Sequence, residues 1–284
     1  MWQHKFRLAG QSGEQMWTDR HRTRHEPRLK DMVFQASLDE VARFLERSDP
    51  PGSPDATPAR RVLAGIAWHL RVGGGWRALP AGFPPWRTVD SWFRRWIDKG
   101  LFEALMRSLA RLQRRRCGRR TGPRLAIIDT QSVKCIGVRG PRGYDGAKKL
   151  VGRKRVALVD AEGHVLALAV VPANVQDRDT LLALDDGKEQ WPSLRLAILD
   201  GAFTAKRCQD WCNLHGMRHR VVEKQPDQKG FVVLERRWLV ERTFGWFSHW
   251  GGLLRERAGR LDVATGRLAC VASLMAASAL NNPS

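Results

Sequence analysis

Three acidic residues stand where a fold could hold their carboxylates for chemistry. Asp129 ends the apolar run LAII and Asp200 ends the apolar run LRLAIL, and runs of this kind predict buried strands. Glu241 lies in RRWLVERTFGW, a segment whose composition otherwise predicts an apolar, basic helix. Because a sheet fixes the backbone of its strands, a side chain at a strand end can be held in a precise position.

Carboxylates that meet at one point repel one another in a partly dry site unless cations neutralise them. Mg²⁺ takes oxygen ligands, and a pair of such ions can activate an attacking oxygen and stabilise a leaving one in phosphoryl transfer. Ordinary structural roles compete with this interpretation. An aspartate after a strand often opens a turn, and Glu241 can pair on a helix surface with Arg237, four residues earlier. The spacing alone leaves both interpretations open.

The charge balance predicts a polyanionic partner. Lysine and arginine outnumber aspartate and glutamate by 49 to 29, for a formal net charge of +20, and the sequence pI is near 11.0. Nucleic acid is the first expectation, with an anionic membrane surface as the competitor. A hydrophobic fraction of 43% and 12 tryptophans exclude a disordered basic tail.

Other totals favour a cytoplasmic protein without membrane contact. The five cysteines make no disulfide framework in a chain of 284 residues, which fits a reducing compartment. The apolar stretch from Leu268 to Leu280 is too short to span a membrane and predicts a buried helix. The opening MWQHKFRLAG lacks the apolar core of a signal peptide.

The first part of the chain predicts a basic arm followed by a helical domain. Residues 1–31 are polar and basic, and we expect a flexible arm there. Across residues 32–116 apolar residues recur every three or four positions, which predicts short helices. Arg94 and Arg95 lie on the polar side of one helix, where a helix-turn-helix-like module would meet DNA. An ordinary bundle with solvated arginines fits the same pattern.

The pattern changes after a basic linker, residues 117–124, within RRRCGRRTGPR. Across residues 125–284, five β-rich runs alternate with helical segments. The runs are LAIIDTQSV, VALVDAEG, HVLALAVVP, LRLAILDGAF and HRVVEK. The predicted helices include DTLLALDDGKEQW, TAKRCQDWCNLHGM and RRWLVERTFGWFSHW. This order predicts an α/β fold, a mixed sheet flanked by helices.

Two further segments suggest binding. The glycines of GPRGYDGAKKLVGRKR permit close approach of a backbone, and phosphate contacts are expected from Lys148, Lys149, Arg153, Lys154 and Arg155. A solvated hairpin is the alternative. CQDWCNLHGMRH suggests zinc, but only two residues separate its cysteine pair from its first histidine. A Cys₂His₂ finger needs about a dozen there, so no zinc is expected.

Five motifs together carry a resemblance to a known family: IIDTQSVK, GPRGYDGAKKLVGRKRVALVD, VVPANVQDRD, ILDGAF and GFVVLERRWLVERTFGWF. In this order they closely resemble the DDE domain of IS5-family bacterial insertion-sequence transposases. RRVLAGIAWHLRVGGGWRALP and FPPWRTVDSWFRRW resemble that family's N-terminal DNA-binding region. The resemblance runs from about Ala59 to Ala279.

The resemblance implies an RNase H-like core that performs Mg²⁺-dependent cleavage and joining at the ends of a mobile element. Asp129, Asp200 and Glu241 match the family's catalytic, metal-binding acids. Arg237 matches the arginine four residues before the glutamate, and we expect it to contact DNA. Ser248 stands where many DDE transposases carry a lysine or arginine, seven residues after the glutamate.

The expected protein is therefore a DNA transposase with endonuclease and strand-transfer activity on double-stranded DNA. Its helical domain would recognise terminal inverted repeats, and its acids would hold two Mg²⁺ ions, with Mn²⁺ able to substitute. We expect a homo-oligomer on DNA in the bacterial cytoplasm, at the nucleoid. A catalytically silent, domesticated or decayed DNA-binding protein is the main alternative, and a nuclease that only hydrolyses is another.

Overall fold

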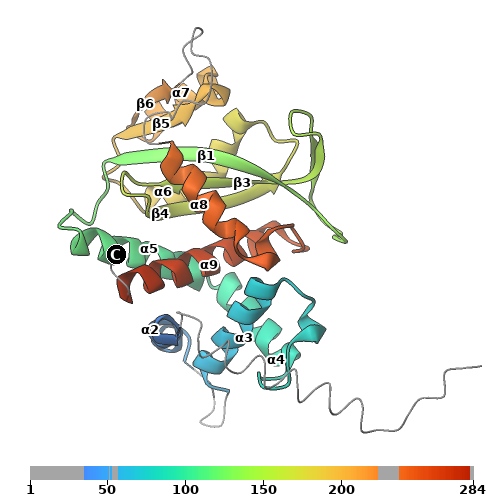
Figure 1. Cartoon of the computed structure of the whole chain (residues 1–284). Helices are drawn as coiled ribbons and strands as arrows, with labels where there is room; N and C mark the ends of the chain where they lie inside the picture. The colour runs from blue at the N-terminus through green and yellow to red at the C-terminus, as the bar shows by residue number, and fades with distance from the viewer. Residues whose placement is uncertain (1–34, 51, 53–56, 223–236, 282–284) are drawn as a thin grey trace, which may run out of the picture.

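The computed structural model describes residues 35–50, 52, 57–222 and 237–281. The predicted arm, residues 1–31, lies outside them. Figure 1 shows a sheet across the upper part of the molecule, helices α5 and α9 beneath it, and helices α2 to α4 at the bottom. The helices are α2 (Gln35–Ser48), α3 (Ala59–Val72), α4 (Trp86–Asp98), α5 (Leu101–Arg116), α6 (Asp185–Glu189), α7 (Lys206–Leu214), α8 (Trp238–Ser248) and α9 (Leu261–Asn281).

The N-terminal helices follow the apolar periodicity of the sequence. On α4, the side chains of Val89, Phe93 and Trp96 are buried at helical spacing. Gly73, at φ +79°, ends α3 and donates its N–H to the carbonyl of His69, as a left-handed C-terminal residue does. The predicted helical region is confirmed. Residues 73–85 separate α3 from α4, a longer link than the three or four residues of a typical helix-turn-helix.

A six-stranded mixed sheet forms the second layer, in the order β2-β3-β1-β5-β6, with β4 also paired to β3. Its strands are β1 (Leu125–Lys134), β2 (Gly143–Asp145), β3 (Leu150–Val159), β4 (Val165–Pro172), β5 (Leu196–Asp200) and β6 (Arg218–Val222). Strands β1, β3 and β4 are antiparallel neighbours, whereas β5 and β6 run parallel to β1. The expected mixed sheet with flanking helices is confirmed.

Two segments differ from the prediction. Strand β3 begins at Leu150, so the basic run before Val156 lies inside the sheet rather than in a loop. The expected single helix of DTLLALDDGKEQW is instead a 3₁₀ segment, η2 (Asp177–Leu184), followed by the short α6. The apolar spacing is interrupted there by Asp185, Asp186 and Gly187. These residue types favour turns and caps over helix interiors, so a single long helix does not form.

One hydrophobic core joins the helical region to the sheet. Leu45 of α2, Trp96 of α4, Ile127 of β1, Phe247 of α8 and Leu268 of α9 belong to one buried cluster. A second cluster covers the other face of the sheet, where α7 packs. Residues 117–124, the predicted linker, lie between the end of α5 and the start of β1, and the regions on either side share one hydrophobic core.

Helix α9 is the predicted C-terminal buried helix, longer than expected. Within the described part of the chain it is the one helix long and apolar enough, by length and composition, to cross a membrane. Of its most apolar window, 67% is buried inside the protein. Its contacts with α5, α2 and β4 are those of a core helix.

Candidate active site: an acidic cluster around Arg237

The sheet register places the two aspartates level with each other. Ile127 of β1 pairs with Ile198 of the parallel strand β5, so two residues further along, Asp129 stands level with Asp200. Side chains two residues apart on a strand share a face. Both aspartates therefore project to the face that carries Ile127 and Ile198, which is the face packed against α8.

Helix α8 brings the third acid to the same place. Val240, Phe244 and Phe247 are buried against the sheet, which leaves Glu241 at the border between the core and solvent. The side chain of Glu241 is 50% exposed, against 11% for Asp129 and 22% for Asp200. Residues more than 100 positions apart in sequence thus meet at one edge of the core.

All three carboxylates converge on a single guanidinium nitrogen. Arg237 Nη2 lies 3.2 Å from Asp129 Oδ2, 3.4 Å from Asp200 Oδ2 and 3.5 Å from Glu241 Oε1. Arg237 stands immediately before α8. Arg237 and Glu241 form the i,i+4 pair that the sequence allows on a helix surface. In the structure this pair is part of the three-carboxylate cluster.

Backbone N–H groups orient the two aspartates. Thr130 N donates to Asp129 Oδ1 at 2.8 Å, and Ala202 N donates to Asp200 Oδ1 at 2.9 Å. Each carboxylate therefore has one oxygen fixed to the backbone while its Oδ2 faces the cation. Burial raises the pKa of Asp129 to about 6, although Arg237 and the Thr130 N–H act in the opposite direction and Asp200 adds to the rise.

The donor set suits a hard divalent cation, because Mg²⁺ and Mn²⁺ prefer carboxylate oxygens. The carboxylates already surround a positive group, the Arg237 guanidinium. In the described residues no group of three or more His, Cys, Asp or Glu side chains is close enough to hold a metal ion as it stands.

The chain matches two known protein families. A family described as "Transposase DDE domain" matches residues 120–276, more than half of the chain. The chain belongs to this transposase family. A second family, described as "Putative transposase of IS4/5 family", matches residues 36–106, which cover the N-terminal helices. The fold class is accordingly α/β, an RNase H-like mixed sheet flanked by helices.

Individual relatives of this transposase-family chain are distant. An uncharacterized protein, y4sN, of Sinorhizobium fredii is 36% identical over 55 residues, 19% of this chain and 44% of that protein. A putative transposase for insertion sequence element IS402 of Burkholderia cepacia is 29% identical over 132 residues, 44% of this chain and 61% of that protein. The chain thus spans about half the length of these relatives.

Among solved structures, the HTLV-2 integrase catalytic core domain in complex with magnesium, in a dimeric form, has 17% sequence identity and a TM-score of 0.29. The match covers 44% of this chain and 67% of that one. A likeness this distant transfers no structural detail.

Three of the basic residues predicted to bind phosphate are buried in this transposase fold. Arg153, Lys154 and Arg155 are 1%, 5% and 2% exposed. Arg153 donates to the carbonyl of Pro141, Lys154 pairs with Asp177, and Arg155 donates to the carbonyl of Leu253. Their burial argues against the expected phosphate contacts. A run of basic residues predicts a solvated segment, but β3 has strands on both sides and its two faces are both covered.

These buried cations secure the segment that follows α8. Arg153 also donates to the carbonyls of Gly259 and Arg260, and Arg267 of α9 donates to the carbonyl of Gly252. Glu256, itself 3% exposed, lies 3.9 Å from Arg153. Sequence reasoning missed this network, since only the covering of β3 by a distant segment creates it.

The other predicted DNA contacts lie at the surface. Lys148 and Lys149 are exposed in the turn between β2 and β3. Lys148 lines a cavity of about 420 Å³ together with Tyr144 and Thr130, and Thr130 adjoins Asp129. Arg94 and Arg95 are 55% and 47% exposed on α4, where they pair with Asp90 and Asp49. No contact between these groups and the acidic cluster is present in the described structure.

The suggested zinc segment packs into the protein. Cys208 and Cys212 of α7 are fully buried in the second core cluster, and burial raises the pKa of their thiols to about 11 and about 12. His215 Nε2 lies 3.1 Å from Asp185 Oδ1. The amphipathic helix explains these residues without a metal.

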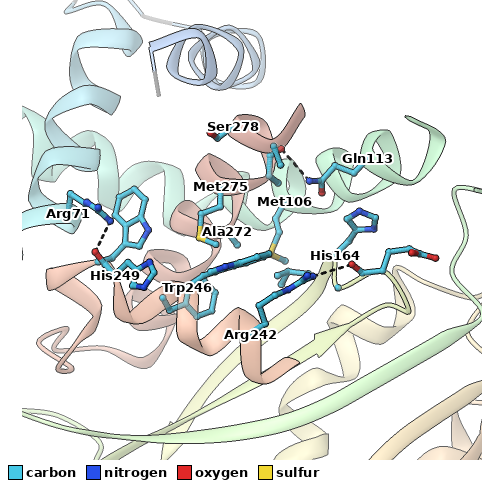
Figure 2. Close-up of a pocket in the computed structure, with 17 residues that line it drawn as sticks. Arg71, Met106, Gln113, His164, Arg242, Trp246, His249, Ala272, Met275 and Ser278 are labelled. Atoms are coloured by element: carbon cyan, nitrogen blue, oxygen red, sulfur yellow. Dashed lines mark hydrogen bonds between the residues drawn. The ribbon is translucent and has the colours of Figure 1, made fainter. Parts of the chain in front are cut away.

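A separate pocket lies on the other side of α8. Arg242 and Trp246 line a cavity of about 610 Å³ together with Met275 and Ala272 of α9, and Figure 2 shows these side chains around it. The Arg242 guanidinium lies 4.8 Å and 4.5 Å from the ring centroids of Trp238 and Trp246, and it donates to the carbonyl of Glu162. None of the three clustered acids lines this pocket.

Proposed function

We propose that the chain is a DNA transposase of the IS5 group, which cuts DNA at the ends of an insertion sequence and joins them to target DNA. The observation that carries this proposal is the convergence of Asp129, Asp200 and Glu241 on one cation in a transposase DDE domain. The excess of 49 basic over 29 acidic residues suits a DNA substrate.

Asp129, Asp200 and Glu241 would hold two Mg²⁺ ions, and Mn²⁺ could replace them. Such ions lower the pKa of an attacking water and stabilise the leaving oxygen in phosphoryl transfer. The chain supplies the alignment: backbone N–H groups fix one oxygen of each aspartate. The half-exposed Glu241 side chain completes the set.

In this proposal the Arg237 guanidinium is the counter-charge of the three carboxylates when no metal is bound. It neutralises carboxylates that would otherwise repel one another. Once displaced it remains next to the reacting centre, where its guanidinium can contact a DNA phosphate. This keeps the DNA contact expected for Arg237 and explains its present position among the acids.

The reaction has two transfers. Water attacks the phosphorus at an element end, the 3′ oxygen leaves with a proton, and a free 3′-OH results. That 3′-OH then attacks a phosphorus of target DNA, whose own 3′ oxygen leaves. Each step exchanges one P–O bond for another, so no redox partner or covalent enzyme intermediate is needed.

We assign DNA recognition and further DNA contacts to residues at the surface. The helical domain, residues 32–116, would recognise the inverted repeats with Arg94 and Arg95, and Lys148 and Lys149 would contact DNA near the acids. Residues 125–284 would form the catalytic domain behind the linker, residues 117–124. A homo-oligomer would bridge two DNA ends, in the bacterial cytoplasm at the nucleoid.

The test is cleavage and joining of labelled duplexes that carry the element's own flanking ends, in Mg²⁺ and in Mn²⁺. Wild type is compared with Glu241→Gln, and DNA binding is measured for both. We expect wild type to cut and join, and the variant to bind without doing either. Binding by wild type without cutting in either metal would instead favour a silent DNA-binding protein, and cutting without joining would favour a nuclease.

A further inference from the structure

A basic site lies away from the acidic cluster, and we propose that it binds the phosphate backbone of DNA. Five arginines line one cavity of about 600 Å³: Arg115, Arg119, Arg120, Arg124 and Arg195. They come from the end of α5, from residues 117–124, and from the turn before β5. The proposal deepens the proposed function, because it names where the chain holds DNA besides the reacting phosphate.

The charge in this arginine pocket is exposed and mostly unpaired. All five arginines are solvent-exposed, and no acidic residue lines the cavity. Arg119 pairs with Glu162 at 3.1 Å, and Arg195 donates to the carbonyls of Pro192 and Leu194. Within the described part of the chain, no hydrogen bond or ion pair engages the side chains of Arg115, Arg120 and Arg124. Guanidinium groups without partners are suited to phosphate oxygens.

Hydrogen bonds hold the backbone that carries these arginines. In this respect the pocket differs from a flexible basic linker. Buried Arg114 pairs with Asp160 and donates its Nε–H to the carbonyl of Arg120 at 2.8 Å. The carbonyl of Arg124 accepts from Arg195 N and Leu196 N at 2.9 and 3.1 Å. Because this backbone is already ordered, little of its conformational freedom is lost when the arginines bind a phosphate.

A tight contact joins the two stretches of chain that line the pocket. Ser193 donates to the carbonyl of Pro123 at 2.8 Å, and a Cβ added at Gly122 would lie 2.6 Å from Ser193 Oγ. Residues 117–124 therefore pass directly over the turn before β5, and Gly122 permits this approach. The two stretches of chain form one basic surface as a result.

The pocket lies at the start of the parallel strands β1 and β5, and the two aspartates lie further along these strands. Arg124 precedes β1 and Arg195 precedes β5, whereas Asp200 is the last residue of β5. At about 3.3 Å per residue, Arg195 and Asp200 are roughly 16 Å apart along the strand. Phosphates in the arginine pocket are thus distinct from the phosphate at the acids, and the pocket would position the duplex rather than take part in the chemistry.

The experiment measures affinity for a 30-base-pair duplex of generic sequence across a salt series in EDTA, so that it is independent of cleavage. Arg120→Gln/Arg124→Gln is compared with Arg255→Gln/Arg257→Gln, which removes the same charge from exposed positions between α8 and α9. Each lost phosphate contact lowers the slope of log affinity against log salt by ~0.9. We therefore expect a slope lower by about 2 for the pocket variant.

We also expect roughly tenfold weaker binding by the pocket variant at low salt, no change for the Arg255→Gln/Arg257→Gln variant, and recovery in Arg120→Lys/Arg124→Lys. Equal slopes and affinities for both glutamine variants would overturn the proposal. So would tight binding of inorganic tripolyphosphate that depends on Arg120 and Arg124 while duplex affinity does not. A pocket-dependent slope in a protein that never cuts DNA would leave this site standing and refute the transposase activity.

Discussion

Arg237 Nη2 lies 3.2 Å from Asp129 Oδ2, across 108 residues of sequence, and the same nitrogen meets Asp200 and Glu241. A guanidinium in the middle of three carboxylates has two consequences. It stabilises the acidic cluster without metal, and it competes with any divalent cation for the same oxygens.

Replacement of Arg237 by glutamine should therefore have opposite effects on the two states. Without metal the carboxylates lose their counter-charge, and we expect a loss of about 1–3 kcal/mol in the free energy of unfolding in EDTA. Mn²⁺ should bind more tightly, because its competitor is gone. Calorimetric titration with Mn²⁺ and melting in EDTA measure the two effects. Weaker Mn²⁺ binding by the variant would show that Arg237 supports the metal site instead, and Arg237→Lys is the charge-retaining control.

Removal of the buried guanidinium of Arg155 should affect stability rather than DNA binding. Arg155→Leu leaves the carbonyl of Leu253 without its donor, and we expect a loss of roughly 2–4 kcal/mol. The salt slope of DNA binding should stay as in wild type. Urea unfolding and duplex binding below the melting temperature measure the two quantities.

Replacement of the exposed lysines provides the reverse case. Lys148→Gln/Lys149→Gln should leave unfolding unchanged, because both side chains are exposed, and should lower the salt slope by about 2. A reduced slope in Arg155→Leu, or an unchanged slope in the lysine variant, would contradict this division between buried and DNA-facing cations.

His69 should make stability fall in acid. It is buried and stacked on Trp76, with ring centroids 3.6 Å apart. Burial, with Arg267 and Arg257 nearby, lowers the pKa of His69 to about 3 from 6.5. Below pH 6.5 the unfolded chain therefore binds a proton at His69 that the folded chain does not bind. The contribution of His69 to the free energy of unfolding is complete above pH 6.5 and decreases as the pH falls toward 3.

This single group should contribute a slope on the order of 1 kcal/mol per pH unit in that window. His69→Phe cannot titrate and keeps an aromatic ring on Trp76. Urea unfolding between pH 4 and pH 8 should therefore give a flatter curve for the variant. Parallel curves for the two proteins would show that the imidazole is not the group responsible.

A close backbone contact links the helical region to the segment after α8. At Gly73, φ is +79° and an added Cβ would lie 2.4 Å from the carbonyl carbon of Gly251. We expect Gly73→Ala to cost about 2–4 kcal/mol in the free energy of unfolding. Gly75→Ala is the matched control, since Gly75 has φ −69° and nothing within 4 Å of its added Cβ. Similar melting temperatures for both variants would contradict the close packing.

Local pattern in the sequence was enough to predict most elements and the acids themselves. The helices of residues 32–116 follow from apolar spacing that the structure buries, as at Val89, Phe93 and Trp96. The strands that carry Asp129 and Asp200 follow from apolar runs of strand length, although β1 continues past Asp129 to Lys134. These features depend on neighbours within a few positions, so the sequence alone carries them.

Tertiary structure alone decided which charges meet and which are buried. No local pattern states that Arg237 lies among Asp129, Asp200 and Glu241, because strand register and the packing of α8 bring them together. Nor does a basic run reveal that Arg153 and Arg155 are buried while Arg120 and Arg124 are exposed. The cost of burying a charge depends on the partners that distant segments supply, and those partners exist only once the chain has folded.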